Sequence, residues 1–119
     1  MVLKLKKKAM IAITPKPPYY AVIFTSVRNV NTEEENIAYD EMARRMNELA
    51  KLQPGYLGIE SARNETGITI SYWKTLHDIT QWKQNSDHVV AQKMGIQKWY
   101  SNYKTRVCLV ERDYSFEKL

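Results

Sequence analysis

The sequence predicts an α+β domain whose strands and helices follow the order βαββαβ. Residues 19–27 (YYAVIFTSV) are rich in β-branched and aromatic side chains, which is typical of a strand. A long amphipathic stretch follows, with apolar residues at the i, i+3, i+4 and i+7 spacing of a helix. Two further strand-like stretches, residues 56–63 and 68–74, flank the turn sequence Asn64-Glu65-Thr66-Gly67.

The first strand and the first helix have clear boundary signals. Three of the four prolines fall in residues 15–18, and they should keep the chain extended until the strand begins at Tyr19. The acidic residues 33–35 precede the helix, where its dipole favours negative charge. Pro54-Gly55 is expected to stop the helix. The apolar face of the helix is formed by Tyr39, Met42, Ala43, Met46, Leu49 and Ala50.

The last third of the chain is expected to supply a helix in two pieces and a final strand. Thr75 is placed to cap a short helix through Trp82, with Asp78 as the acid of a capping box. Residues 104–114 should close the fold as a strand. The resulting order is the ferredoxin-like plan, a two-layer sandwich with an antiparallel sheet. Between the short helix and the final strand, Ser86 is expected to cap a further helix. One face of that helix would carry Ile96, Trp99, Tyr100 and Tyr103.

Both faces of the predicted sheet are apolar. Successive side chains of a strand point to opposite faces, and the two helical segments can cover only one of them. A second copy of the same sheet is the simplest cover for the other face, so the sequence predicts a homodimer joined through its sheets. The first strand illustrates the pattern, with one face formed by Tyr20, Val22 and Phe24 and the other by Tyr19, Ala21, Ile23 and Val27.

Composition and charge exclude several classes of protein. The chain of 119 residues is 44% hydrophobic and 26% charged, close to the globular average. Its net charge of +5 arises from residues 1–32, because residues 33–119 carry −1. A nucleic-acid-binding fold is expected to carry positive charge on its folded body, so we expect no nucleic-acid partner. No apolar run approaches the ~18 residues of a membrane helix, so we expect no membrane partner either.

The cellular compartment is expected to be the cytoplasm. The only cysteine, Cys108, fits a reducing compartment, and the apolar stretch after the first lysines is too short for a signal peptide. We divide the chain into a basic, proline-containing N-terminal extension (residues 1–18), the domain (residues 19–115) and a C-terminal tail (residues 116–119).

Three segments of the chain resemble the antibiotic biosynthesis monooxygenase family. They are residues 53–61 (QPGYLGIES), residues 71–74 (SYWK), and residues 79–83 (ITQWK) with Ser86-Asp87-His88 after them. The resemblance extends over residues 19–114. It implies that the domain, residues 19–115, is a small ferredoxin-like protein that pairs into a dimeric α+β barrel.

The resemblance implies an oxidoreductase with one of two chemistries. Some members of the family oxidise phenolic or anthrone-like aromatic molecules with O₂ and without a metal or organic cofactor, whereas others bind and open haem. Haem-opening members have a Trp, matched here by Trp82, and an iron-ligating His at about the position of Gln92, which is a poor iron ligand. They also have an Asn on the first strand, where this chain has Thr25 and Ser26.

The leading hypothesis is therefore a cofactor-independent monooxygenase acting with O₂ on a small aromatic molecule, phenolic or polyketide-like. Two alternatives stay open for the domain, and a third, nucleic-acid binding, concerns only the lysine-rich start of the chain. One is a haem-binding or haem-degrading monooxygenase, with haem as the group bound. The other is a non-catalytic, dimeric small-molecule-binding or stress-related module.

Candidate catalytic residues follow from the needs of such an oxygenase. A base must ionise the substrate, and donors must hold the oxyanion in a dry pocket. His88 is the candidate base, because a position near a helix start disfavours its positive form. Tyr72 and Tyr103 are candidate oxyanion donors, and Tyr100 is a candidate pocket hydroxyl beside Tyr103. The sequence shows no metal-ligand pattern, so no metal site is expected.

Candidate substrate-binding residues are aromatic or cationic. The walls of a pocket for a flat ligand are predicted from three tryptophans, Trp73, Trp82 and Trp99. Trp73 alternates with Tyr72 along one strand, so only one of the two can face the helices. Arg28 is expected to balance an anionic substrate, with Arg106 on a neighbouring position of the sheet.

Overall fold

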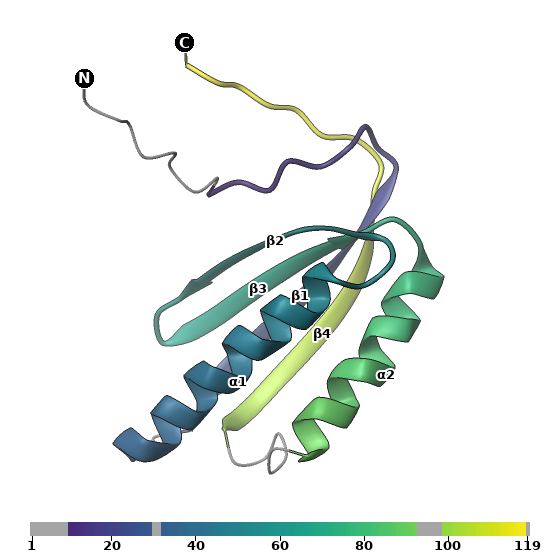
Figure 1. Ribbon diagram of the computed structural model, residues 1–119. Helices are drawn as coiled ribbons and strands as arrows, with labels where there is room; N and C mark the ends of the chain where they lie inside the picture. Colours follow the sequence, from purple (N-terminus) through teal and green to yellow (C-terminus); the bar gives the residue numbers. More distant parts are fainter. Residues whose placement is uncertain (1–9, 30–31, 93–98, 119) are drawn as a thin grey trace, which may run out of the picture.

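Four strands and two helices form a two-layer sandwich in the computed structural model, which describes residues 10–29, 32–92 and 99–118 (Figure 1). Both helices lie on the same side of the sheet. The predicted βαββαβ order is confirmed, with the elements β1 (Tyr19–Arg28), α1 (Glu33–Lys51), β2 (Tyr56–Arg63), β3 (Thr66–Trp73), α2 (Leu76–Gln92) and β4 (Tyr100–Val110).

The sheet is antiparallel, with the strand order β2-β3-β1-β4. Val22 in the central strand lies beside Ser71 of β3 and Val107 of β4, so these three side chains share a face. This is the helix-side face, on which α1 and α2 lie, although Val107 of β4 is 50% exposed there. Ala21 and its neighbours Tyr72 and Cys108 share the other face, here called the open face. The predicted division of the first strand between two faces is therefore confirmed.

Each helix begins at a side-chain cap. The Thr32 hydroxyl accepts a hydrogen bond from the Glu35 backbone N–H at 3.2 Å, and residues 33–35 place three carboxylates in the first turn of α1. The expected capping box of α2 is confirmed, because the Asp78 N–H donates to the Thr75 hydroxyl at 3.0 Å. Gly55, in the stop sequence after α1, has φ +80°, and the Asp78 carboxylate occupies the place of its missing side chain.

The expectation of a helix break at Ser86 is wrong. α2 runs without interruption from Leu76 to Gln92. The Ser86 hydroxyl donates a hydrogen bond to the backbone carbonyl of Lys83, 3.0 Å away. Ser86 is therefore bonded within α2 and does not cap a new helix. The ion pair between Lys83 and Asp87, one turn apart, also spans this point at 2.9 Å.

The last strand starts earlier than the sequence predicts. Tyr100 and Tyr103 lie on β4 and not on a helix, because this segment pairs with β1 from Tyr19↔Val110 to Arg28↔Tyr100. Pairing with a central strand satisfies the backbone of a segment rich in Tyr, Thr and Val. Ile96, assigned to the same expected helix, lies outside the described residues.

Two buried tryptophans, Trp73 and Trp99, join the sheet layer to the helix layer. Trp73 is fully buried and stacks on Trp82 of α2, with ring centroids 6.0 Å apart. Trp99, just before β4, is also buried, and its ring meets Tyr39 of α1 edge to face at 6.1 Å. Among the described residues, the buried apolar side chains also include Met42 of α1.

Two extended arms, residues 10–18 and residues 111–118, leave the same end of the sheet (Figure 1). The hydroxyl of Tyr19, on the open face, joins their bases because it donates to the Asp113 carboxylate at 2.6 Å and accepts from the Thr14 hydroxyl at 2.9 Å. The N-terminal arm also contacts β2, where the Ala12 N–H donates to the Glu60 carboxylate at 2.9 Å. In the described parts of the chain, no helix is long and apolar enough to cross a membrane.

Candidate functional site

A cavity of about 310 Å³ lies between the helix-side face and the two helices. α1 supplies one wall through Tyr39, Met42 and Met46, and α2 supplies another through Ile79 and Trp82. The amphipathic pattern of the sequence explains this placement, because the apolar face of each helix must point at the sheet. The sheet forms the floor with Val22, Phe24, Ile59, Thr69, Ser71, Tyr100, Tyr103, Thr105 and Val107.

Aromatic rings from both layers cluster at one end of this cavity. Phe24 of β1 packs against Tyr100 and Tyr103 of β4, with ring centroids 5.5 and 5.4 Å apart. Tyr39 of α1 meets Tyr100 edge to face at 5.7 Å. The Trp82 ring lines the cavity from α2, on the side where it stacks on Trp73. Such a set of faces and edges suits a flat aromatic ligand.

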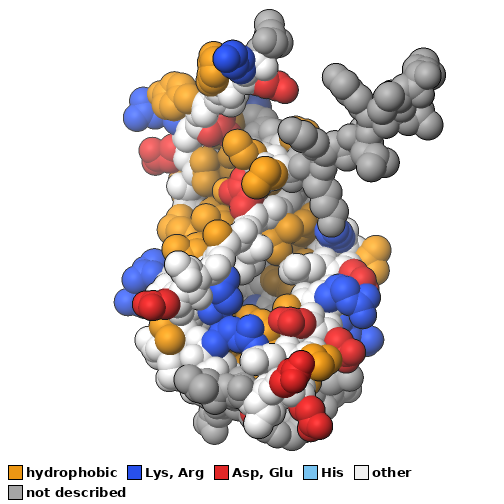
Figure 2. Space-filling model, turned by 90° about the vertical axis from the view of Figure 1, so that its left-hand side faces the viewer, with side chains coloured by type: hydrophobic (Ala, Val, Ile, Leu, Met, Phe, Trp, Pro, Cys, Tyr) orange, Lys and Arg blue, Asp and Glu red, His pale blue; other side chains and the backbone are white. Residues whose placement is uncertain are grey.

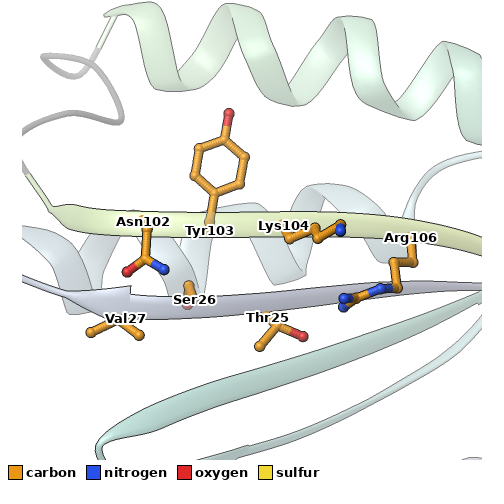
Figure 3. A pocket seen from close by; sticks show the side chains of 7 residues that line it. All are labelled: Thr25, Ser26, Val27, Asn102, Tyr103, Lys104 and Arg106. Atoms are coloured by element: carbon orange, nitrogen blue, oxygen red, sulfur yellow. The ribbon is translucent and has the colours of Figure 1, made fainter.

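The polar groups in the sheet and α1 walls are mainly hydroxyls. The Tyr100 hydroxyl donates to the Tyr39 hydroxyl at 3.0 Å. The Ser71 hydroxyl accepts from the Trp73 indole N–H at 2.8 Å. The Tyr103 hydroxyl has no hydrogen-bond partner among the described residues, and Figure 3 shows its ring pointing from β4 towards α2. The hydroxyls of Tyr39, Ser71 and Tyr103 donate to no acceptor among the described residues, so they can donate to an oxygen atom of a ligand.

Two arginines lie near the tyrosine end of the cavity. The Arg28 guanidinium carbon lies 3.8 Å from the centre of the Tyr39 ring, and its Nη2 donates to the Asn36 side chain at 2.9 Å. Arg63 donates to the Ser26 hydroxyl. The pKa of Tyr100 is raised by burial and by the hydrogen bond to Tyr39, while the charges of Arg63 and Arg28 act in the opposite direction.

The α2 wall carries the only acid and base pair of the cavity among the described lining residues. Lys83 and Asp87 form an ion pair at 2.9 Å, and both side chains are largely exposed. They therefore belong to the rim. Within the described ranges, no cluster of three His, Cys, Asp or Glu side chains could hold a metal ion.

Some of the predicted site residues come together at this cavity. Trp82 and Tyr103 line it directly. Trp73 lies behind Trp82, and Trp99 lies behind Tyr39, so these two tryptophans back the walls. Arg28 also lies behind the Tyr39 ring rather than in the lining.

Other predicted residues lie elsewhere. Tyr72 is on the open face, where its hydroxyl donates to the Glu60 carboxylate at 2.6 Å and burial raises its pKa. The His88 side chain is exposed and is not part of the described lining. Because α2 is continuous, His88 lies in its second half, and the argument from a helix start does not apply to it. Arg106 is on the open face, opposite to Arg28, so the expected neighbouring positions are wrong.

Sequence reasoning missed Tyr39 as a site residue, whereas Tyr100 and Tyr103, both expected as pocket hydroxyls, do line the cavity. Tyr39 was assigned only to the apolar face of the first helix, although a hydroxyl on that face is itself a signal of a polar site. The expected helix over Tyr100 conceals its pairing opposite Arg28 on β1.

A second, shallow pocket of about 270 Å³ lies mainly on the open face (Figure 3). Thr25, Val27, Asn102 and Arg106 point to this side, whereas Tyr103 points to the helices. With Lys104 also in its lining, the pocket carries two positive side chains.

The fold and the cavity together define the class. This is a ferredoxin-like α+β sandwich with an aromatic-lined cavity between sheet and helices, and the sandwich is the fold of solved structures described as candidate antibiotic biosynthesis monooxygenases. The chain belongs to the same family as the uncharacterized protein YqjZ of Bacillus subtilis strain 168, with 44% identity over 107 residues that cover 88% of this chain and 90% of the relative. No family profile matches the sequence.

Three solved structures share this fold at low sequence identity. PA3566 of Pseudomonas aeruginosa has a TM-score of 0.61 and 15% identity, covering 84% of this chain and 99% of that one. A Nitrosomonas europaea protein described as a candidate antibiotic biosynthesis monooxygenase has a TM-score of 0.57 and 15% identity, covering 86% and 96%. SnoaB of Streptomyces nogalater, described as a cofactor-independent oxygenase, has a TM-score of 0.60 and 8% identity, covering 86% and 100%. The predicted resemblance is thus confirmed at the level of the fold.

Proposed function

We propose that this protein is a cofactor-independent monooxygenase that acts with O₂ on a small aromatic molecule. The observation that carries the proposal is the cavity of about 310 Å³, walled by Trp82, Phe24 and three tyrosines. Its volume lies near the lower limit of about 300–1,000 Å³ for small-molecule sites, which favours a ligand of a few rings. The description of SnoaB as a cofactor-independent oxygenase supports the same chemistry.

The cavity supplies what an electron-rich aromatic substrate needs. Apolar walls exclude water, and ring contacts with Trp82 and Phe24 orient the substrate. Hydroxyl donors such as that of Tyr103 stabilise the negative charge of the ionised substrate. The anionic ring is then able to pass an electron to O₂, so the protein needs only to bind, ionise and shield it.

Oxygen uptake tests this proposal directly. Purified protein is incubated with phenols, naphthols and anthrones, and O₂ consumption is followed with an electrode. We expect uptake with at least one class, and the Trp82→Ala variant should lose it because an aromatic wall is removed. A Tyr114→Phe variant is the matched control, since Tyr114 is exposed on the C-terminal arm. Absence of uptake with every class contradicts the proposal.

The base of the reaction remains a separate prediction. His88 is the residue predicted from the sequence, and it follows directly after Asp87, which lines the cavity rim. Unchanged oxygen uptake in a His88→Ala variant would remove His88 from the mechanism. Tyr72, the other predicted catalytic residue outside the cavity, is tested in the same way with Tyr72→Phe.

One observation favours a non-catalytic binding module as the second candidate. Asp87 is the only carboxylate in the described lining, and its ion pair with Lys83 occupies it. A protein that binds aromatic compounds, measured by quenching of tryptophan fluorescence, but consumes no O₂ is such a module. A hemin titration tests the haem alternative, which predicts a shifted Soret band.

We also propose a homodimer joined through the open face. Neither helix covers this face, and Ile68 on it is 43% exposed. The arms beside it carry further exposed apolar side chains, including Ile11, Ile13 and Phe116. Figure 2 shows hydrophobic side chains gathered in the upper half of one side of the molecule, next to the arms. Burial of such surface favours association with a second copy.

A further inference from the structure

We propose that Tyr39 holds the oxygen atom of a phenolic ligand as its anion, and that Tyr100 and Arg28 position and strengthen Tyr39 as the donor. This inference rests on the proposed function and deepens it, because it assigns one end of the cavity to a phenolate oxygen. Tyr39 is the residue that touches the ligand, while Tyr100 and Arg28 act through it.

The hydrogen-bond direction leaves the Tyr39 proton available. The Tyr100 hydroxyl donates its hydrogen bond to the Tyr39 hydroxyl oxygen, 3.0 Å away. The Tyr39 hydroxyl therefore accepts one bond, and no residue in the described part of the chain accepts its own hydrogen. Both residues belong to the cavity lining. A hydroxyl that already accepts a hydrogen bond is a better donor, because chains of hydrogen bonds polarise one another.

Arg28 adds positive charge behind the same ring. Its guanidinium carbon lies 3.8 Å from the centre of the Tyr39 ring, and the bond of 2.9 Å to Asn36 at the start of α1 holds it there. A cation over the face of a phenol draws electron density from the ring. The Tyr39 hydroxyl then donates more strongly, and negative charge on a bound oxygen is favoured.

Two arginines favour an anion at this end, whereas the carboxylates of residues 33–35 in the first turn of α1 and the burial of Tyr100 act against one. From β2, Arg63 reaches Ser26 across Gly67, and both Arg63 and Arg28 favour negative charge at Tyr100. From β4, Tyr103 lies beside Tyr100, with ring centroids 6.1 Å apart. From α2, Lys83 and Asp87 line the cavity, and their opposite charges form an ion pair.

The consequence is chemical. When a phenol binds, its O–H bond breaks, the proton leaves to solvent water, and the phenolate oxygen accepts a hydrogen bond from Tyr39. No oxidant or reductant takes part in this step. The phenolate is the form that can later pass an electron to O₂, so binding itself would prepare the substrate.

Two nitro-aromatic probes test the inference on the intact protein. 4-Nitrophenol changes its visible absorbance when it ionises, whereas 4-nitroanisole has the same ring but no ionisable oxygen. Binding of both is measured by quenching of tryptophan fluorescence, and ionisation of bound 4-nitrophenol is followed by absorbance across a pH series. We expect bound 4-nitrophenol to ionise at lower pH than the free probe, and 4-nitroanisole to bind without such a pH dependence.

Variants assign the effect to named residues. Tyr39→Phe should weaken 4-nitrophenolate binding by about tenfold or more, because a hydrogen bond to a charged group is lost, while 4-nitroanisole binding changes by less than about twofold. Tyr100→Phe and Arg28→Met should each remove part of the ionisation shift, and Arg28→Lys should restore some of it. Tyr114→Phe, on the exposed arm, is the control.

The outcomes distinguish a failure of the Tyr39 inference from a failure of the proposed function. If both probes bind but the ionisation of 4-nitrophenol is not shifted, or is shifted equally in Tyr39→Phe, the inference is wrong and the aromatic cavity stands. If neither probe binds, the proposed function fails together with the inference. If Tyr39→Phe does not fold, an ionisation shift in Tyr100→Phe equal to that of the unaltered protein overturns the inference.

Discussion

The indole rings of Trp73 and Trp82 stack with their centroids 6.0 Å apart and their planes 23° from parallel. Trp73 belongs to β3 and has no solvent exposure, whereas Trp82 belongs to α2 and lines the cavity. The sheet thus sets the position of the α2 wall through one aromatic contact. The Ser71 hydroxyl fixes the Trp73 ring in turn, because it accepts the indole N–H at 2.8 Å.

Truncation of Trp73 should therefore damage both stability and the cavity. We expect Trp73→Ala to lower the free energy of unfolding by about 3–5 kcal/mol, as for other buried aromatic residues, and Trp73→Phe to cost less. Urea unfolding followed by circular dichroism measures both. Tyr114→Ala, at a side chain that is 86% exposed, should stay within about 0.5 kcal/mol of the unaltered protein. A loss below about 1 kcal/mol for Trp73→Ala would contradict this role.

Removal of the Tyr103 hydroxyl should affect activity but not folding. This hydroxyl has no hydrogen-bond partner in the described residues, so Tyr103→Phe should leave the midpoint of urea unfolding unchanged. Loss of a donor to a developing oxyanion should lower the rate of oxygen uptake by about tenfold or more. Oxygen electrode measurements at saturating substrate check the rate. Equal rates for Tyr103→Phe and the unaltered protein would show that Tyr103 only shapes the cavity.

High pH should destabilise the fold through its buried tyrosines. Burial raises the pKa of Tyr19, Tyr56, Tyr72 and Tyr100 above the ordinary value of 10.0. Below pH 10 these groups are neutral in both states, so their contribution to stability is fully present. Above pH 10 the unfolded chain loses protons that the folded chain keeps, and stability falls as pH rises towards the folded-state pKa values. Melting temperatures measured from about pH 8 to pH 11 should therefore decline mainly above pH 10.

Tyr100→Phe separates this effect from general alkaline denaturation. The variant lacks one of the groups with a raised pKa, so its melting temperature should decline less steeply above pH 10 than that of the unaltered protein. Tyr114→Phe provides the comparison at an exposed position. Parallel declines in all three proteins would show that Tyr100 ionisation does not govern the loss.

The sequence was sufficient to predict the fold because local signals and periodicity agree in most elements. The capping box at Thr75 and the amphipathic pattern of α1 both report local physics, and both are confirmed. The failure at Ser86 has a local cause too, since a serine can bond its own helix as readily as it can cap a new one. The helix assigned to Tyr100 fails for a non-local reason, because pairing with β1 determines the conformation of that segment.

The site was predicted only in part, because its geometry depends on contacts between residues that are distant in the chain. Aromatic content indicates a pocket, and Trp82 and Tyr103 do line it. Tyr72 and Trp73 are neighbours on β3, so the sequence shows that they point to opposite faces but not which of them faces the helices. The register with β1 and the contact with Trp82 show that it is Trp73. The pair of Tyr39 and Tyr100 joins residues that are far apart in the chain, so their hydrogen bond depends on how the helix packs on the sheet.

Association through the open face gives the last prediction. Ile68 lies on this face opposite Thr25, and it is 43% exposed in the single chain. A charge placed there would have to be buried without a partner in a sheet-to-sheet dimer, and such burial is costly. Light scattering at micromolar concentration should therefore give a dimer mass for the unaltered protein and a monomer mass for Ile68→Glu. Leu52→Glu, at the 79% exposed residue after α1, should remain dimeric. A monomer mass for the unaltered protein would contradict the proposed homodimer, and dissociation by both variants would show that added charge, rather than the open face, is responsible.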